Sequence, residues 1–358
     1  MTEIRLVKYR DTKEEFLDLF RAAFGQEMSS GLWDWKYIEN PLVVGDPDLV
    51  VALDGGKVVG ARPFLLAEMW INDRKVKAAQ PCDTMVHPKY RGQGLFGRMN
   101  QFAIDYFEGQ GCALFYNFPN SMSRLGYLGQ GWRLVSSMES LFHVLNARNV
   151  ISYRVNSRLL GLALGSVYNM VPRAGRKESL SLTGFRMGIS DHFTPELKED
   201  SLRENWGIDL VRSEAYMKWR FEQHPEHKYT YVIAKERDEV KGYAVISIQE
   251  QDERLRHGMI VDYLVKDNSI DCFHDLMTEC IQQLKKKCDI ISAWASPHSG
   301  FTDELIKNGF KTSSKFPYNR VFQEAQFVAR EVNTQAIGSF DIYDKDNWRV
   351  TRAYADFA

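Results

Sequence analysis

The sequence predicts an α+β (mixed α/β) fold made of two tandem domains, each with a mostly antiparallel central sheet flanked by helices. Three observations predict this class. The chain of 358 residues is too long for one ordinary hydrophobic core and short for three domains. Stretches with the alternating pattern of strands are interleaved with stretches of helical spacing. Several short motifs of the first half recur in the same order in the second half.

The first half reads as an antiparallel meander between helices. A strand over 2–10 precedes an amphipathic helix over 12–24. The strands that follow are joined by tight turns rich in Asp, Asn and Gly, and they cover residues 49–53, 57–66 and 75–86. The remaining elements are a helix over 95–107, a strand over 112–118, a helix over 121–127 and a strand over 132–144.

Domain boundaries follow from the place where this pattern weakens. Residues 146–200 contain a helical stretch over 155–170 and a polar stretch over 173–178, which is the composition of a connection between domains. We therefore expect a first domain over 1–145, a helical connector over 146–200, a second domain over 201–330 and a C-terminal segment over 331–358.

The repeat consists of motifs that keep their spacing. Trp35-Lys36-Tyr37 with Pro41 recurs at one constant offset as Trp219-Arg220-Phe221 with Pro225. Pro119 and Gly131-Trp132 likewise recur as Pro297 and Gly309-Phe310 with equal internal spacing. Two similar domains therefore stand in tandem.

Composition excludes several classes of protein. The 46 basic and 47 acidic residues nearly cancel, so no net field would draw the molecule to nucleic acid or to an anionic membrane. Five cysteines without a Cys-x-x-Cys pair indicate reduced thiols, a cytoplasmic protein and no metal site. The first residues lack the apolar core of a signal peptide, and the most apolar run, 159–171, is shorter than the roughly 20 residues of a membrane span.

The motif that carries chemistry is a strand over 82–86, a loop over 87–93 with a glycine, and a helix that begins near Leu95. Glycines let the backbone approach phosphate oxygens, and the positive end of the helix dipole favours negative charge. No Walker loop is present. The glycines at 92, 94 and 97 match the dinucleotide fingerprint, but the long loop before them and the missing acidic residue after the next strand disfavour that interpretation. A purely structural glycine turn remains an alternative.

The segment Arg91-Gly92-Gln93-Gly94-Leu95-Phe96 resembles the pyrophosphate loop of the GNAT acetyltransferase superfamily, and His87-Pro88 resembles its usual lead-in. Phe96 departs from the small residue that the family prefers. Further along, Tyr127 and the Gly131-Trp132 pair resemble the end of the GNAT motif, although its first aromatic residue is missing. The resemblance covers residues 1 to about 145 by motifs, and about 200 to 330 by the repeat alone.

The resemblance implies an N-acetyltransferase with acetyl-CoA as co-substrate. A small-molecule or peptide amine would attack the thioester directly in a ternary complex, with no covalent enzyme intermediate. The backbone N–H near Val86 or His87 would meet the developing oxyanion. The residues implied in binding acetyl-CoA are Met85, Val86, His87, Arg91, Gly92, Gln93, Gly94, Leu95, Phe96, Asn120 and Ser123, and the cations offered to its nucleotide phosphate are Lys75, Lys89 and Arg98.

The catalytic candidates are an acid and a base. Tyr127 is the candidate general acid for the departing thiolate. The base stays open between Asp83, Glu68, His87, a water chain and the C-terminal stretch 354–358, and no metal is expected. The aromatic residues Trp33, Trp35 and Tyr37 lie where family members build an acceptor pocket, but their recurrence in the second copy favours a packing anchor.

The second copy lacks the site. Its stretch 261–268 has no glycine where the first copy has the loop, and Leu305 replaces Tyr127. We therefore expect an active first domain, a degenerate second domain, and a homodimer as an allowed assembly. Two other functions remain: a Fem-type aminoacyl transferase, which the weak net charge disfavours, and a non-catalytic acyl-CoA-binding scaffold.

Overall fold

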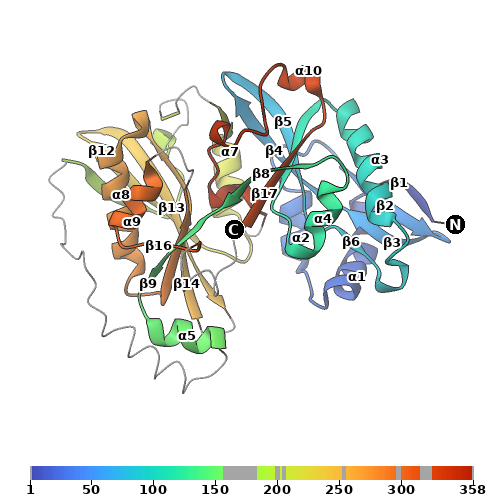
Figure 1. The fold of residues 1–358 in the computed structure, drawn as a ribbon, viewed down its shortest axis with the longest axis horizontal. Helices are drawn as coiled ribbons and strands as arrows, with labels where there is room; N and C mark the ends of the chain where they lie inside the picture. The colour runs from blue at the N-terminus through green and yellow to red at the C-terminus, as the bar shows by residue number, and fades with distance from the viewer. Residues whose placement is uncertain are drawn as a thin grey trace.

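The computed structural model describes residues 2–155, 184–197, 202–203, 207–251, 255–295, 300–314 and 325–356. Two lobes lie side by side, each built of β-sheet covered by helices, and the C-terminal end of the chain lies between them (Figure 1). The predicted fold class is confirmed. The predicted helix over 155–170 and the polar stretch 173–178 lie almost wholly outside the described residues.

The first lobe is built from the first part of the chain. Its strands are β1 (Glu3–Lys8), β2 (Asp48–Asp54), β3 (Lys57–Arg62), β4 (Phe64–Ile71), β5 (Arg74–Pro81), β6 (Met85–Val86), β7 (Cys112–Asn117) and β8 (Arg133–Met138). Its helices are α1 (Lys13–Phe24), α2 (Ser30–Tyr37), α3 (Leu95–Gly109) and α4 (Ser121–Leu128).

The rest of the chain supplies the second lobe and returns to the first. The strands are β9 (Ser140–Val144), β10 (Arg186–Ser190), β11 (Ile208–Leu210), β12 (Tyr229–Glu236), β13 (Glu239–Gln251), β14 (Leu255–Val265), β15 (Ile290–Trp294), β16 (Lys311–Thr312) and β17 (Ala325–Glu331). The helices are α5 (Ala147–Val155), α7 (Glu214–Met217), α8 (Ile270–Leu284), α9 (Phe301–Lys307) and α10 (Thr334–Ile337).

Two breaks divide the first lobe into two sheets. The predicted strand over 57–66 is broken at Pro63, whose ring removes a backbone donor, so β3 and β4 belong to different sheets. The predicted strand over 75–86 is broken at Asp83, which has a left-handed φ of 46°. One sheet has the order β1-β2-β3-β6 and the other the order β11-β4-β5-β7-β17-β8.

The second break makes two neighbouring strands diverge. β5 runs parallel to β7, and their pairing ends at Ala79 and Phe115. Beyond Asp83 the chain turns to pair with β3, so β6 lies at the edge of the four-stranded sheet. The chain then enters the loop before α3, and α3 packs its buried Leu95, Met99 and Ala103 over both sheets.

The lobes exchange strands. β9 leaves the first half and lies between β15 and β16 in the seven-stranded sheet β10-β12-β13-β14-β15-β9-β16. In return, β17 lies between β7 and β8 in the first lobe (Figure 1). The predicted strand over 132–144 is therefore two strands in different lobes, and sheet membership crosses the sequence boundaries at 145 and 330. Periodicity predicts that a segment is a strand, but it does not name the strand beside it.

The repeated tryptophans meet between the lobes. Trp35 Nε1 donates to the backbone oxygen of Trp219 at 2.8 Å, and Trp219 Nε1 donates to that of Trp35 at 2.9 Å. Their rings stack with centroids 4.7 Å apart. This reciprocal contact has the form of an isologous interface, as expected when two copies of one fold pack around a local two-fold axis. It supports the packing role that the sequence favoured for Trp35.

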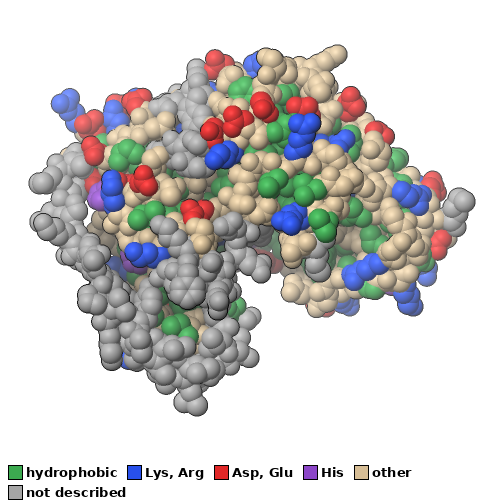
Figure 2. Space-filling model, viewed as in Figure 1, with side chains coloured by type: hydrophobic (Ala, Val, Ile, Leu, Met, Phe, Trp, Pro, Cys, Tyr) green, Lys and Arg blue, Asp and Glu red, His purple; other side chains and the backbone are tan. Residues whose placement is uncertain are grey.

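The surface carries both signs of charge. In Figure 2 acidic and basic side chains are interspersed over the visible face, in agreement with the near-zero net charge. Among the described residues, no helix combines the length and the apolar character needed to cross a membrane.

Candidate active site

The glycine loop ends at the first turn of α3. Gly92 and Gly94 have left-handed φ values of 78° and 70°, and Gly94 is the N-cap of this 15-residue helix. A side chain at either position would be strained, whereas glycine adopts this conformation freely. The loop residues 91–94 are exposed. Backbone N–H groups at an exposed helix N-terminus form a site for an anion.

The basic side chains near the loop already have partners. Arg91 donates from Nε to the backbone oxygen of Val86 at 3.3 Å and from Nη2 to that of Ala23 at 2.9 Å. Arg98 donates to both oxygens of Thr2. Lys75 lies at the other end of β5, over the Trp70 ring. Of the three cations expected near the nucleotide phosphate, the structure places Lys89 and Arg98 beside the loop and Lys75 far from it.

The edge of β6 offers one free backbone donor beside the loop. His87 N–H donates to Val59 O at 2.9 Å, so this group faces β3 and is not available to an oxyanion. Successive N–H groups of a strand point in opposite directions. Val86 N–H therefore faces the open edge, where the Val86 carbonyl accepts Arg91. Of the two oxyanion donors expected, the geometry leaves Val86.

Tyr127 is buried on the α3 side of this edge. It is 3% exposed, and its ring meets those of Phe96 and Trp132 edge-on at 5.4 and 4.8 Å. The large Phe96 is accommodated because α4 has a glycine opposite it: a Cβ at Gly126 would lie 3.1 Å from the Phe96 ring. The departure from the family pattern at position 96 is thus matched by a small residue on the neighbouring helix.

Beneath Tyr127 lies a buried arginine. Arg62 is 0% exposed and donates to Asn100 Oδ1 at 2.6 Å, with Thr84 Oγ1 at 3.4 Å. Its carbon Cζ lies 5.4 Å from the centre of the Tyr127 ring. Burial lowers the pKa of Arg62, and interaction with Tyr127 opposes this.

Asn120 and Ser123 bind each other at the start of α4. Asn120 Oδ1 accepts the Ser123 N–H at 2.9 Å and the Ser123 hydroxyl at 3.0 Å. Asn120 is exposed and Ser123 half-buried at the N-terminal end of the helix that carries Tyr127. Their arrangement is that of a helix cap.

On the face of β6 opposite Tyr127, near α2, Asp83 and Asp356 flank the buried Lys36. Lys36 Nζ lies 2.6 Å from Asp83 Oδ2 and 3.4 Å from Asp356 Oδ2. The Tyr37 hydroxyl donates to the same Asp83 oxygen at 2.5 Å. Ligand atoms of Asp83, Asp356 and Cys82 lie within 4.8 Å of one another, and the Lys36 ammonium provides the countercharge between the two carboxylates.

This environment changes the acidity of its members. Burial raises the pKa of Asp356, and Asp83 raises it further, although Lys36 acts in the opposite direction. Burial would lower the pKa of Lys36, but Asp83 and Asp356 outweigh it, so the ammonium form persists. Two carboxylates that share one cation titrate as a pair.

Glu68 and His87 do not join this cluster. Side chains alternate along β4, and Glu68 lies on the face opposite Leu65 and Ala67, which share a core with Cys82. The ring of His87 accepts the Lys89 N–H and stays in the loop. Among the base candidates in the described residues, the structure groups Asp83 with Asp356 of the C-terminal stretch.

The cysteines do not form a nucleophilic centre. All five are free and buried. Burial raises the pKa of each thiol, to about 12 for Cys112 and about 11 for Cys288. Thiols of raised pKa are poor nucleophiles at neutral pH.

Sequence reasoning missed several polar residues of the site. Lys36, Arg62, Gln80 and Arg220 are all nearly or fully buried. Lys36 and Arg220 stand in the middle of the repeated aromatic triplet, so a cation flanked by two buried aromatics was the available signal. Arg62 and Gln80 lie in ordinary strand patterns that give no such signal.

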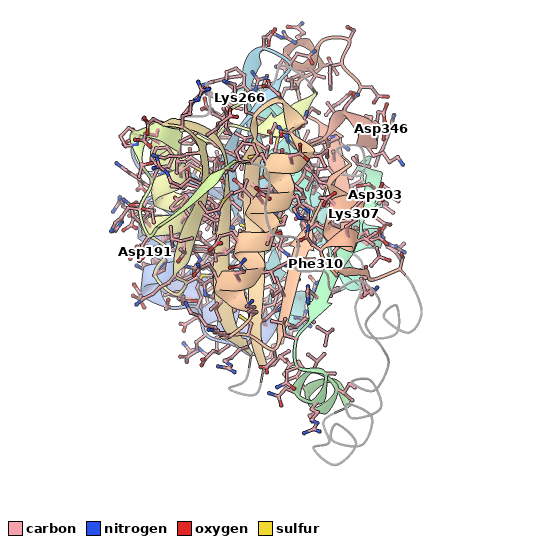
Figure 3. All side chains as sticks on the ribbon, turned by 90° about the vertical axis from the view of Figure 1, so that its left-hand side faces the viewer. Asp191, Lys266, Asp303, Lys307, Phe310 and Asp346 are labelled. Atoms are coloured by element: carbon pink, nitrogen blue, oxygen red, sulfur yellow. The ribbon has the colours of Figure 1, made fainter. Side chains whose placement is uncertain are left out.

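The second lobe lacks these features at the matching positions. Its helix α8 begins after Lys266–Asn268, and Lys266 pairs with Glu239 at 2.6 Å. Leu305 on α9 is buried in the core, as is Phe310. Figure 3 shows this lobe from its outer side, with Asp303 and Lys307 on α9 and Phe310 just after it.

The sequence of the first domain matches the model of a known protein family. The model of the acetyltransferase (GNAT) domain family matches residues 3–135. The first domain of this chain is therefore similar in sequence to GNAT acetyltransferase domains. A comparison with curated proteins gives no match by sequence.

Solved structures extend the likeness to both lobes. A GCN5-related N-acetyltransferase from Anabaena variabilis aligns with a TM-score of 0.63 at 14% identity, covering 93% of this chain and 74% of that one. A probable N-acyltransferase of unknown function from Enterococcus faecalis aligns with 0.64 at 14%, covering 94% and 74%. A tandem GNAT protein from the clavulanic acid biosynthesis pathway aligns with 0.51 at 12%, covering 95% and 100%. At such identities the likeness establishes the fold, which is the tandem GNAT fold.

Proposed function

We propose that this protein transfers an acetyl group from acetyl-CoA to an amine acceptor in a ternary complex. One observation carries the proposal: an unpaired strand edge, β6, diverges from β7 beside a glycine loop at a helix N-terminus. The edge suits the amide-bearing arm of CoA as an added strand, and the loop suits its pyrophosphate. The first domain is the catalytic one, and the second is degenerate.

The candidate acid and base lie on opposite faces of β6. Tyr127 and Arg62 belong to the α3 side, where the CoA sulfur would leave. Asp83 and Asp356 belong to the α2 side, where an amine would arrive. In this arrangement a carboxylate takes the proton from the acceptor ammonium, Val86 N–H stabilises the oxyanion, and the Tyr127 hydroxyl protonates the thiolate.

The residues proposed to bind acetyl-CoA divide into two groups. Those whose backbone lines the edge and the loop are Met85, Val86 and the residues from Arg91 to Phe96, whereas His87 keeps its N–H for β3. Asn120 and Ser123 stand at the entrance to α4, where their mutual hydrogen bonds must be exchanged before they bind a ligand.

Calorimetric titration with acetyl-CoA tests the proposal. Gly94→Trp forces a side chain onto a left-handed residue at the N-cap of α3, and we expect it to abolish micromolar binding shown by the unmodified protein. Gly111→Trp is the matched control, because Gly111 has a φ of 72° and lies just beyond the other end of α3. The proposal fails if the folded unmodified protein does not bind acetyl-CoA, and also if both variants lose binding equally.

A further inference from the structure

Arg220 is a buried cation without an acidic partner. It is 1% exposed, its Nη2 donates to the backbone oxygen of Ala355 at 2.8 Å, and it also interacts with the hydroxyls of Tyr216 and Tyr229. Nε and Nη1 have no hydrogen-bond partner among the described residues. The carboxylate of the adjacent Asp356 turns to Lys36 instead. A guanidinium carries five N–H donors, and burying them unpaired destabilises the folded protein.

Arg212 is another buried arginine, and all three of its guanidinium nitrogens are paired with carboxylates. Arg212 binds Asp262 through two nitrogens, at 2.8 and 3.1 Å, and Asp209 through a third at 2.8 Å. It lies in the same region between the lobes and is equally buried. The contrast leaves Nε and Nη1 of Arg220 as open donors among the described residues.

Gln80 is a second buried polar group without a partner. It is 0% exposed, and neither its oxygen nor its nitrogen is hydrogen-bonded to any described residue. Side chains alternate along β5, so Gln80 shares the face of Ala78 and Cys82, which is the face of the Asp83 cluster. It lies one residue beyond the last paired position of β5 and β7, where the strands diverge.

Tyr116 connects the two groups. It follows Phe115 on β7, beside Gln80 on the neighbouring strand. Its ring lies 5.9 Å, centre to centre, from that of Tyr354, and the next residue, Ala355, accepts the Arg220 hydrogen bond. Unpaired donors therefore adjoin the carboxylates at the point where an acceptor would meet the acetyl group.

We propose that this region binds the carboxylate of a zwitterionic acceptor, a free α-amino acid, through Arg220 and Gln80. The acceptor's ammonium faces Asp83 and Asp356, which matches the roles given to them in the proposed function, on which this inference rests. The charges agree: Lys36 and Arg220 balance Asp83 and Asp356, so the fixed charges sum to zero and a net-neutral ligand adds none. A guanidinium fork binds a carboxylate with two parallel hydrogen bonds.

The test compares acceptors that differ only in the carboxylate. Standard L-α-amino acids are assayed with acetyl-CoA beside their primary amides and their decarboxylated amines. With the unmodified protein we expect kcat/KM for the best free amino acid to exceed that for its amide by roughly 10- to 100-fold, the usual value of hydrogen bonds to a charged group. In Arg220→Met this ratio falls to about 1.

The variant Arg220→Lys separates the effect of the positive charge from that of the guanidinium shape. It keeps the charge but loses the fork, so we expect an intermediate ratio. The amide rate reports whether each variant is folded and active. An equal loss for amino acid and amide in Arg220→Met would show that Arg220 only holds the Ala355 backbone, and would overturn the inference. So would an unmodified protein that prefers the amide or the amine.

A binding measurement separates this inference from the proposed function. If acetyl-CoA binds and amines are acetylated without regard to a carboxylate, the function stands and the inference is wrong. If acetyl-CoA does not bind but the amino acid binds by calorimetry and loses affinity in Arg220→Met, the carboxylate site stands and the transferase proposal is wrong. If neither ligand binds to the folded protein, both are wrong.

Discussion

At the scale of single residues, the site is organised by which face of β6 each side chain occupies. Tyr127 and Arg62 share the core under α3, whereas Lys36, Asp83 and Asp356 cluster near α2. Sequence motifs led to the proposal of the loop residues and Tyr127 as site residues, because these follow a local pattern. They could not predict the pairing of Asp83 with Asp356, since residues distant in the chain meet there only through tertiary packing.

Replacing Tyr127 by Phe tests the proton donor. Loss of the hydroxyl should lower kcat by roughly 10²- to 10⁴-fold, the usual contribution of a general acid. The dissociation constant of acetyl-CoA should change by less than about twofold, because the ring and its packing remain. Steady-state kinetics and calorimetry provide the two readouts.

Tyr106→Phe is the matched control for that change. Tyr106 also lies in the first lobe, and its hydroxyl binds Asp48 at 3.0 Å, away from the loop. Its kcat should stay near that of the unmodified protein. If Tyr127→Phe behaves like Tyr106→Phe, Tyr127 is a core residue and not the acid.

The dependence of the rate on pH tests the base. Asp356 must lose its proton to act, and burial together with Asp83 raises its pKa above the ordinary 3.8. Activity should therefore fall as the pH falls through that raised pKa, so log kcat/KM has an acid limb above pH 3.8. In Asp356→Asn the acid limb assigned to Asp356 should disappear.

Either Asp83 or Asp356 could produce the acid limb of the pH profile. The profile of the unmodified protein is therefore compared with those of both single variants. Rates of the unmodified protein, Asp356→Asn and Asp83→Asn would be measured from about pH 4 to 9. An acid limb that is unchanged in both variants would exclude the two carboxylates as the base.

At the scale of elements, the pattern identified most helices and strands but joined some that the structure separates. The stretch 57–66 keeps its hydrophobic character across Pro63, and 75–86 keeps it across Asp83. Pro63 was a usable sign of a break. Asp83 was not, because an aspartate that adopts a left-handed backbone between two strands has no distinctive sequence. That break makes β6 an edge and so creates the proposed binding site for CoA.

At the scale of the whole molecule, the repeat predicted two similar domains, and the reciprocal Trp35–Trp219 contact agrees with it. The exchange of β9 and β17 was not predictable, because β-strands of similar composition fit either sheet. Two of the three sheets contain strands from both halves of the chain. The two halves are therefore one cooperative unit, unlike domains joined by a simple linker.

Expressing the two halves of the chain as separate fragments tests whether they fold as one cooperative unit. A fragment of residues 2–139 lacks β17, so β7 and β8 each lose a strand partner next to the core. We expect it to aggregate when produced alone, since unpaired edges promote association. Co-expression with residues 140–356 should restore a soluble complex that elutes as one species in size-exclusion chromatography. A folded, monomeric 2–139 fragment would contradict the expectation.

The strand exchange also constrains the order in which the protein folds during its synthesis. β17 enters the first sheet only after the ribosome has made everything between β8 and residue 331. At the usual 5–20 residues per second this is a delay of roughly 10 to 40 s, during which the first lobe leaves the exit tunnel with a gap in its sheet. Folding of the first lobe must then finish after translation of the second. Chaperones that shield exposed strands of nascent chains would bind in that interval.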